Sequence, residues 1–372
     1  MARSEAAPPA RAGGVLDIDL AAIAENWRRL SQRLAAPASA AAVVKADAYG
    51  LGMTQVAPAL AQAGCTLFFV ATLDEGMTLR RLLPAAEIAV LNGLLPGTSD
   101  DFREARLVPV LNDLGEIARW RDAAETRALP AMIHIDTGMA RLGLAPADVA
   151  RLAAAPEMLA GLALRMVLSH LACSDEPEHP LNARQLAAFR AARAVLPAAP
   201  ASFASSSGIF LGADYHFDVA RPGAALYGVN PIPSRPNPMA QVVRLKGRIL
   251  QVRDVDTSMT VGYGAAHRME RAGRIATVAV GYADGWLRSS SHRGSAAIAG
   301  QRVPVIGRIS MDLMTLDVTG VDPALARPGD FVDLIDDQYG IDAVAAAAGT
   351  IGYEILTALG RRHHRIYRGG AT

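Results

Sequence analysis

The stretch VVKADAYGLG at residues 43–52 joins the end of an apolar run to a lysine, a tyrosine and two glycines. A lysine sheltered at the end of a strand can exist as a neutral amine, and a neutral amine condenses with an aldehyde. Four residues after Lys45, Tyr49 would reach a phosphate oxygen where Gly50 lets the backbone approach closely. The segment therefore predicts a lysine site for pyridoxal 5'-phosphate (PLP). The ordinary alternative for so short a motif is a strand-end lysine that extends into solvent.

The composition favours a small-molecule substrate and a reducing compartment. A chain of 372 residues predicts two domains, and its net charge of +1 indicates neither a nucleic-acid nor an acidic partner. Two cysteines, Cys65 and Cys173, cannot build a disulfide framework. The first 14 residues lack the apolar stretch of a secretory signal, and no apolar run is long enough to span a bilayer. We therefore expect a cytoplasmic protein that binds neither nucleic acid nor membrane.

Short apolar runs alternate with stretches of helical period over the first 230 residues. Buried strands that alternate with helices are typical of a parallel barrel. Eight strands are predicted, at 43–44, 67–70, 88–91, 108–111, 132–135, 166–168, 202–204 and 217–220. Helices are predicted at 19–33, 55–63, 75–83, 114–124, 147–154 and 184–196.

A proline-rich segment at residues 230–238 predicts a linker, because it cannot continue a helix. Beyond it, strand-like runs separated by Gly, Asp and Pro turns predict a mainly β domain, closed by a helix at 343–359 and a basic tail at 361–368. The predicted class is α/β. The predicted domains are a disordered extension at residues 1–14, a TIM-type (β/α)8 barrel at 15–233 and the mainly β domain at 234–372. The predicted strands of the β domain lie at 242–255, 275–280, 296–299, 303–306, 314–318 and 331–335.

Five polar clusters follow the predicted barrel strands at their carboxyl ends, where barrels of this kind build their sites. Each has an ordinary alternative as a turn, a helix cap or a strand-end histidine, but their joint placement predicts one site. The clusters are Lys45, DTGMAR at 136–141, Ser169-His170, SSSG at 205–208 and RPG at 221–223.

Motifs in both predicted domains resemble those of the alanine racemases, a family of fold-type III PLP enzymes. The resemblance implies a homodimer with shared active sites that interconverts L-alanine and D-alanine with PLP, to supply D-alanine for peptidoglycan or to feed alanine catabolism. The matching stretches are VVKADAYGLG (43–52), HIDTGMARLG (134–143), LSHLACSDE (168–176), RPGAALYG (221–228), VGYGA (261–265), GYADG (281–285), GRISMD (307–312) and GYEIL (352–356).

The resemblance assigns two bases to opposite faces of the substrate. Lys45 binds the cofactor covalently and then serves the D-enantiomer, while Tyr263, from a neighbouring subunit, serves the L-enantiomer. Tyrosine titrates at ~10 and lysine at ~10.4, so both pKa values must be lowered for action near neutral pH.

Other residues are implied to bind the cofactor and the substrate. Arg221 faces the pyridine nitrogen; because it stays protonated, it weakens the ring as an electron sink, which suits a reaction that only moves a proton. His170 lies beside the ring and bonds to Arg221. Arg141 and the backbone amide of Met311 lie near the substrate carboxylate, and Arg141 also lies near the phenolic oxygen of the cofactor. The implied phosphate ligands are Tyr49, Ser206, the backbone of Gly223 and Ala224, and Tyr353.

His134 departs from the family pattern, in which this position is often a lysine that becomes carbamylated and orients the arginine equivalent to Arg141. We hypothesise that a neutral His134 accepts a hydrogen bond from Arg141, or that a bound anion fills the space. No residues indicate a metal site.

Three other functions are alternatives to alanine racemisation. A racemase for another small amino acid, such as serine, would share these motifs. A non-catalytic PLP carrier would lack the β domain with Tyr263. A fold-type III decarboxylase usually places an acidic residue at the ring nitrogen and a cysteine motif in its second domain, whereas both cysteines here precede residue 174.

Overall fold

The computed structural model describes residues 9–124 and 127–370 and divides the chain into two compact units. One unit is Ile23–Ala240, and the other combines Met1–Ala22 with Gln241–Thr372. Most of the extension predicted for residues 1–14 lies outside the described residues, since the description begins at residue 9.

The first unit is a parallel barrel, as the sequence predicts. Seven strands pair in the order β3-β4-β5-β6-β7-β8-β9, and β10 (Val219–Ala220) pairs with β2 (Ser39–Ala40). Backbone bonds close the ring: Arg221 N donates to Ala204 O (2.8 Å) and Ala41 N donates to Ala220 O (2.9 Å). The seven strands are β3 (Ala42–Val43), β4 (Leu67–Val70), β5 (Glu87–Val90), β6 (Val108–Leu111), β7 (Leu129–His134), β8 (Leu162–Leu168) and β9 (Ala201–Ser202).

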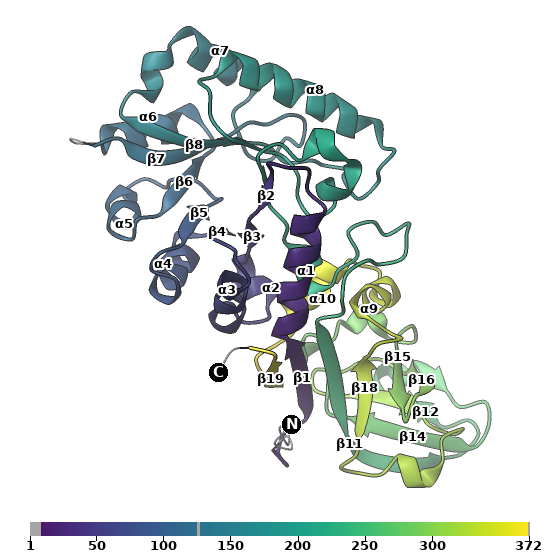
Figure 1. Cartoon of the computed structure of the whole chain (residues 1–372). Coiled ribbons are helices and arrows are strands. Elements are labelled where there is room, and N and C mark those ends of the chain that lie inside the picture. Colours follow the sequence, from purple (N-terminus) through teal and green to yellow (C-terminus); the bar gives the residue numbers. More distant parts are fainter. Residues whose placement is uncertain (1–8, 125–126, 371–372) are drawn as a thin grey trace. The chain divides into compact units, whose positions relative to one another are not determined.

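Helices lie outside this ring of strands (Figure 1). The carboxyl-terminal parts of the strands are buried because helices cover their outer face, which explains their apolar runs. All six predicted helices are confirmed, and the short α5 (Ser99–Glu104) is an additional one. The predicted six are α1 (Leu20–Gln32), α3 (Met53–Gln62), α4 (Leu73–Leu82), α6 (Leu114–Asp122), α7 (Pro146–Ala154) and α8 (Pro180–Val195).

The proline-rich segment at residues 230–238 contains neither helix nor strand. Its side chains bond to its own backbone and to the barrel unit: Asn230 Nδ2 donates to Arg235 O (2.7 Å) and Asn237 Nδ2 donates to Gly228 O (2.8 Å). Asparagine side chains therefore hold this segment with hydrogen bonds, although the backbone nitrogens of its prolines cannot donate.

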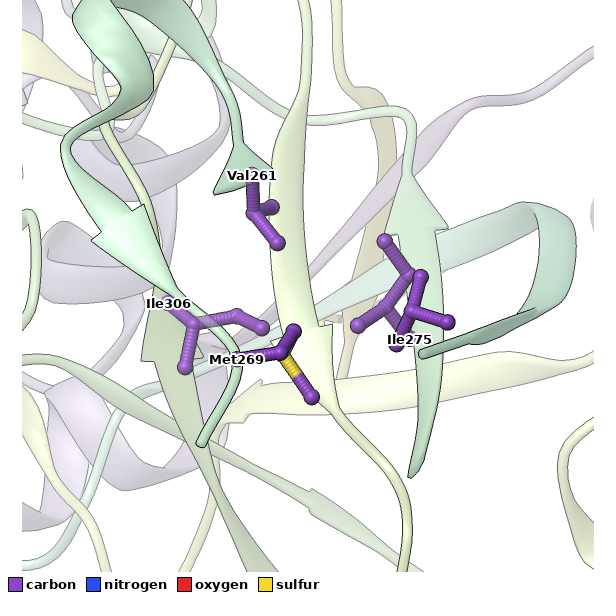
Figure 2. Packing of buried hydrophobic residues seen from close by; sticks show 5 residues of the cluster. Val261, Met269, Ile275 and Ile306 are labelled. Atoms are coloured by element: carbon purple, nitrogen blue, oxygen red, sulfur yellow. The ribbon is translucent and has the colours of Figure 1, made fainter. Parts of the chain in front are cut away.

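The second unit is built on an eight-stranded sheet in the order β14-β17-β16-β15-β18-β11-β1-β19. Its longest strand, β11 (Val243–Val255), pairs with three neighbours, namely β1, β14 and β18. Val255, Val261, Met269, Ile275 and Ile306, each at most 7% exposed, form a buried apolar cluster in this unit (Figure 2). The mainly β character of this unit is confirmed. Its other strands include β14 (Gly273–Val278), β15 (Ser295–Ile298), β16 (Gln301–Ile306), β17 (Met314–Asp317) and β18 (Phe331–Ile335).

Two features of this unit differ from the sequence-based expectation. The segment β1 (Gly14–Asp19) is a strand that pairs antiparallel with β11 and parallel with β19 (His364–Arg368), whereas the sequence grouped residues 15–22 with the barrel. The helix expected at 343–359 is two helices, α9 (Ile341–Ala348) and α10 (Gly352–Ala358), bent by 97°. The break occurs because Gly349 takes a left-handed conformation (φ 72°) that ends α9.

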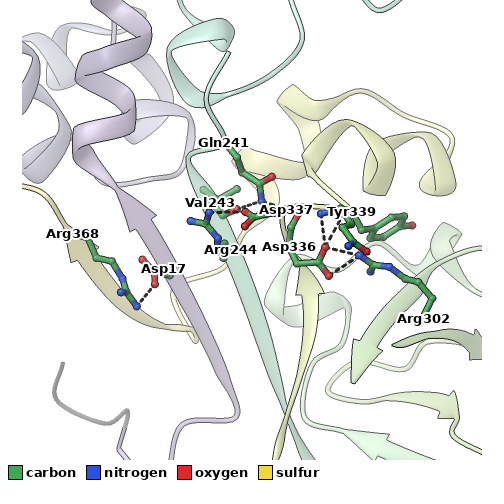
Figure 3. Close-up of polar contacts among 10 residues, drawn as sticks. Asp17, Gln241, Val243, Arg244, Arg302, Asp336, Asp337, Tyr339 and Arg368 are labelled. Carbon is green, nitrogen blue, oxygen red and sulfur yellow. Dashed lines mark hydrogen bonds and ion pairs between the residues drawn. The ribbon is translucent and has the colours of Figure 1, made fainter. Parts of the chain in front are cut away.

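Ion pairs tie the strand ends of the second unit together (Figure 3). Arg368 Nη2 lies 2.5 Å from Asp17 Oδ2 and so joins β19 to β1. Arg302 bonds both carboxylate oxygens of Asp336 at 2.5 and 2.7 Å, joining β16 to the end of β18. The basic tail predicted at 361–368 is thus partly a strand whose last arginine is paired.

No single helix in the described parts of the chain is long and apolar enough to cross a membrane. The bent pair α9 and α10 meets the length and composition criteria only when both helices are taken together.

Candidate active site

Lys45 begins a turn with a left-handed backbone directly after the first barrel strand. The four residues Ala46–Tyr49 have φ between 53° and 55°, and Gly50 follows at 81°. A non-glycine residue in this conformation costs roughly 1–2 kcal/mol, so four in succession persist only where their surroundings hold them. Backbone bonds support the turn: Ala48 N donates to Val44 O (2.9 Å) and Gly50 N donates to Ala46 O (2.7 Å). Strain of this kind is concentrated at functional sites.

The surroundings of Lys45 favour its neutral form. The side chain is partly buried. Burial lowers the pKa of the ammonium below its usual value, and the positive charge of Arg141 lowers it further, while the negative charge of Glu75 opposes both. A lysine with a lowered pKa supplies the neutral amine that carbonyl chemistry requires.

Ser206 and the backbone at Gly223 form a tight polar cluster at the ends of the last two strands. Ser206 is 3% exposed, and its Oγ accepts from Gly223 N (3.0 Å) and Ala225 N (3.2 Å). A Cβ at Gly223 would lie 2.3 Å from the Tyr49 hydroxyl oxygen, so only glycine lets Tyr49 approach here. Ala224, 2% exposed, follows directly. Hydroxyl groups and closely approached backbone are the groups that commonly hold a phosphate.

Arg221 is a buried cation at the same rim. It is 5% exposed; Nη2 donates to Ser169 O (2.6 Å), and Nη1 donates to Ser202 Oγ. Burial lowers its pKa to about 10, so it stays protonated at neutral pH. Within residues 9–124 and 127–370, no ion pair involves Arg221. A buried charge of this kind is suited to an electron-rich partner such as a ring nitrogen.

His170 lies beside these cations and is neutral. Burial lowers its pKa to about 3, and the positive charges of Arg221 and Arg141 act in the same direction. The ring of His170 is therefore a neutral neighbour of Arg221 rather than a second cation. The hydrogen bonds of the Arg221 guanidinium in the described residues go to Ser169 O and Ser202 Oγ, not to His170 as expected from the resemblance.

His134 is also neutral, and its tautomer follows from its partner. His134 Nδ1 lies 2.9 Å from Asn112 Oδ1. The amide nitrogen of Asn112 already donates to Leu91 O and Val110 O, so Oδ1 accepts and His134 Nδ1 carries the hydrogen. The lone pair of His134 is therefore on Nε2. Burial, followed by the charge of Arg221, lowers the pKa of His134 to about 4.

A buried network links the loops after β7 and β8. Gln185, 0% exposed, donates to Thr137 Oγ1 (3.1 Å) and His170 O (3.0 Å), and Thr137 Oγ1 lies 2.8 Å from Ser169 Oγ. Sequence reasoning missed Gln185 and Asn112, because neither stands in a motif and their partners are distant in sequence. Within the described ranges no group of three His, Cys, Asp or Glu side chains is placed to hold a metal ion.

The lowered pKa values of the half-buried His134 and His170 predict a loss of stability in acid. A histidine whose folded pKa is lowered from 6.5 to about 4 contributes stability that is full above pH 6.5 and is lost as the pH falls toward 4, because the unfolded chain binds the proton first. For His134 the free energy of unfolding should fall by up to about 1.4 kcal/mol per pH unit in this window. Urea unfolding of the wild type and of His134→Gln tests this. The variant should show a shallower pH dependence, and identical slopes would contradict the assignment.

Tyr263, Met311 and Tyr353 lie in the second unit. Tyr263 is 71% exposed and stands between Gly262 and Gly264, both in the left-handed region. Met311 is 55% exposed in a loop. Tyr353, 39% exposed, is at the start of α10.

The structure thus gathers one group of the predicted residues on the rim of the barrel and places the others in the β unit. The rim group is Lys45, Tyr49, Arg141, His170, Ser206, Arg221, Gly223 and Ala224, linked by the bonds and charge interactions above. A barrel that presents a lysine amine of lowered pKa, a buried arginine and a phosphate-type cluster at the ends of its strands defines a lysine-dependent cofactor enzyme.

Comparison with known proteins gives the family. A family model for the N-terminal domain of alanine racemase matches residues 18–231, and a model for its C-terminal domain matches 242–367. Alanine racemase of Rhodospirillum rubrum is 52% identical over 362 residues, which cover 96% of this chain and 97% of that protein. A catabolic alanine racemase of Mesorhizobium japonicum is 49% identical, with coverage of 97% and 95%.

Solved structures agree with these sequence comparisons. The crystal structure of alanine racemase from Bartonella henselae with covalently bound pyridoxal phosphate matches with a TM-score of 0.92 and 41% identity, covering 96% of this chain and 99% of that one. The chain belongs to the alanine racemase family.

Proposed function

We propose that this protein racemises alanine with PLP and that Lys45 and Tyr263 are its two bases. The observation that carries the proposal is the Lys45 amine, whose pKa is lowered and which a strained left-handed turn presents at the carboxyl end of the first barrel strand. Family membership supports the choice of alanine as substrate.

The residues of the barrel rim offer the kinds of groups that PLP requires, namely an amine for its aldehyde and donors for its phosphate. Lys45 is the amine that would hold the aldehyde carbon. The Ser206 hydroxyl, the backbone at Gly223 and Ala224, and the hydroxyl of Tyr49 would hold the phosphate. Tyr353, which belongs to the second unit, is proposed as a further phosphate ligand. The approach of Tyr49 to Gly223 is an observation of this structure that favours the fit. When bound, PLP withdraws electrons from the amino acid that it carries and so acidifies the α-proton.

The two bases move protons at the substrate α-carbon. One base removes the α-proton from its face, and the other delivers a proton to the opposite face, so the configuration inverts and no net proton is consumed. Lys45 acts on the D-enantiomer and Tyr263 on the L-enantiomer. Each base ends a turnover in the protonation state that the reverse direction requires, which allows the same pair to catalyse both directions.

Arg221, Arg141 and Met311 set the specificity of the reaction. Arg221 stays charged, because its pKa of about 10 lies above neutral pH, and it would keep the ring nitrogen of a bound cofactor unprotonated. This limits the electron withdrawal by the ring and favours simple proton transfer over side reactions. Arg141 and the backbone amide of Met311 bind the substrate carboxylate and fix the direction in which the α-proton points.

Tyr263 is supplied to the site by a second copy of the chain, so the active form is a homodimer. The large exposure of Tyr263, 71%, fits a side chain that serves a site outside its own fold. The two cysteines are unpaired, which fits a reducing compartment such as the cytoplasm. The reaction would either supply D-alanine for peptidoglycan or feed alanine catabolism, since both roles need the same chemistry.

The proposal is tested by incubating the purified protein with L-alanine and PLP and separating the enantiomers by chiral chromatography. D-alanine should accumulate until the two enantiomers are equal, and D-alanine as substrate should reach the same end point. Protein freed of PLP is the control. Bound PLP without any D-alanine would overturn the proposal.

Activity should be independent of bicarbonate. A neutral histidine at position 134 cannot form the stable carbamate that a lysine forms, and its Nε2 lone pair offers an acceptor without carbon dioxide. We expect kcat to change less than about twofold between bicarbonate-free and bicarbonate-rich buffer. The variant His134→Lys, which introduces a primary amine, is the comparison and should respond. A sharp rise of wild-type activity with bicarbonate would contradict the role of His134.

A further inference from the structure

The carboxylate of Glu75 holds the turn that carries Lys45. Glu75 Oε1 accepts from the backbone N–H of Ala46 at 2.6 Å, directly after Lys45. Glu75 Oε2 accepts from Ala71 N at 2.8 Å and Thr72 N at 3.2 Å, in the loop after the next strand, β4. One carboxylate thus ties together the loops that follow β3 and β4.

Glu75 is itself fixed by the start of α4. It occupies the third position of that helix, and Thr72 Oγ1 accepts from Glu75 N at 3.3 Å, so the two residues form a capping box. An ordinary capping box satisfies donors of its own helix only. Here Oε2 bonds to the start of its own helix, and Oε1 reaches across to Ala46 in the neighbouring loop. A capping role does not require this second contact.

The geometry requires a carboxylate rather than an amide. Both oxygens of Glu75 face N–H groups, so a glutamine would direct its own NH2 group at one of these donors in either orientation. Charge-assisted bonds of this kind are also stronger than neutral ones.

A second glutamate in the barrel makes the same type of tie elsewhere. Glu116, also at the third position of a helix, accepts from Asn112 N at 2.7 Å and from the backbone N–H of Leu94, joining the loops after β6 and β5. Those residues are not in a left-handed turn. Glu75 differs because the segment that it holds, Ala46–Tyr49, is strained and carries the reacting amine.

We propose that Glu75 is a positioning residue for Lys45, which fixes the left-handed turn so that the amine and the Tyr49 hydroxyl keep their places. The inference rests on the proposed function in one respect, namely that Lys45 is the reacting amine. The negative charge of Glu75 also reaches Lys45, consistent with their closeness.

The test is the variant Glu75→Gln, studied as the full chain with and without PLP. Amide hydrogen exchange, resolved by residue, should be at least about tenfold faster at Ala46–Gly50 than in the wild type. With PLP, kcat should fall about tenfold or more while the KM for alanine changes less than about threefold, because Lys45 rather than the substrate site has moved. The variant Glu75→Asp, which keeps the charge but is too short to bridge both loops, should behave in the same way.

Two controls separate positioning from general loss of stability. Glu116→Gln removes the matching tie and should speed exchange near Leu94 and Asn112 but leave Ala46–Gly50 as in the wild type. Thr72→Ala weakens the same helix start without removing the carboxylate and should keep kcat within about twofold. Unchanged exchange at Ala46–Gly50 in both Glu75 variants overturns the proposal. If the wild type makes no D-alanine, the proposed function fails, and the exchange result still decides whether Glu75 holds the turn.

Discussion

Replacing Lys45 with alanine is expected to lower kcat for alanine racemisation at least about 10³-fold. The change removes the only group on the rim whose environment favours a neutral amine, since burial and Arg141 lower its pKa. The effect should be equal in the two directions, because the same residue acts on the D-enantiomer whichever way the reaction runs. Rates are measured by chiral chromatography with L-alanine and with D-alanine.

The fold of the Lys45→Ala variant should be retained, since the lysine side chain makes no ion pair in the described parts of the chain and is only partly buried. Thermal unfolding of the variant without PLP, compared with the wild type without PLP, checks this. Lys45→Arg is the matched control: it keeps a long cationic side chain that does not deprotonate, and it should be as inactive as alanine. More than about a tenth of wild-type activity in either variant would contradict the assignment.

Replacing Tyr263 with phenylalanine is expected to lower racemisation about 10²- to 10⁴-fold and to separate the two half-reactions. Without the tyrosine hydroxyl, the α-proton of L-alanine is no longer removed. Lys45 remains, so the α-hydrogen of D-alanine should still exchange with solvent deuterium. Mass spectrometry of recovered D-alanine and L-alanine after incubation in deuterium oxide measures the two exchange rates.

The phenylalanine change should leave stability unaltered, because Tyr263 is 71% exposed and only its hydroxyl is removed. Tyr339→Phe, at a partly buried tyrosine of the same unit that packs on Arg302, is the matched control and should retain full activity. If Tyr263→Phe abolished exchange of both enantiomers equally, or of neither, the division of labour between the two residues would be wrong.

Much of the fold is predictable because its signals are local. The barrel strands are continuous apolar runs, and the helices between them have regular period, so both can be read from neighbouring residues. The strand β1 (Gly14–Asp19) cannot be read in this way, since its partners β11 and β19 lie more than 200 residues away in sequence. α5 has only Phe102 buried in six residues, which leaves no helical pattern to detect.

Those site residues that stand in recognisable sequence motifs are predictable from the sequence. Lys45, Ser206 and Arg221 stand in recognisable stretches, and the structure places them on one rim. The left-handed turn of Ala46–Tyr49 is not visible in the sequence, because alanine and aspartate have no preference for that conformation strong enough to impose it. The residues that stabilise the site, such as Glu75, act through backbone contacts between loops. Such contacts leave no pattern of side-chain types.

The most direct test of the two-base account follows the label at early conversion of L-alanine in deuterium oxide. Lys45 exchanges its protons with solvent, so D-alanine formed in the first few per cent of reaction should carry deuterium at the α-carbon. Tyr263 holds a single proton and returns it, so the remaining L-alanine should keep its protium. Product that retains protium, or substrate that loses it as fast as product forms, would show that one base serves both faces and would contradict the account.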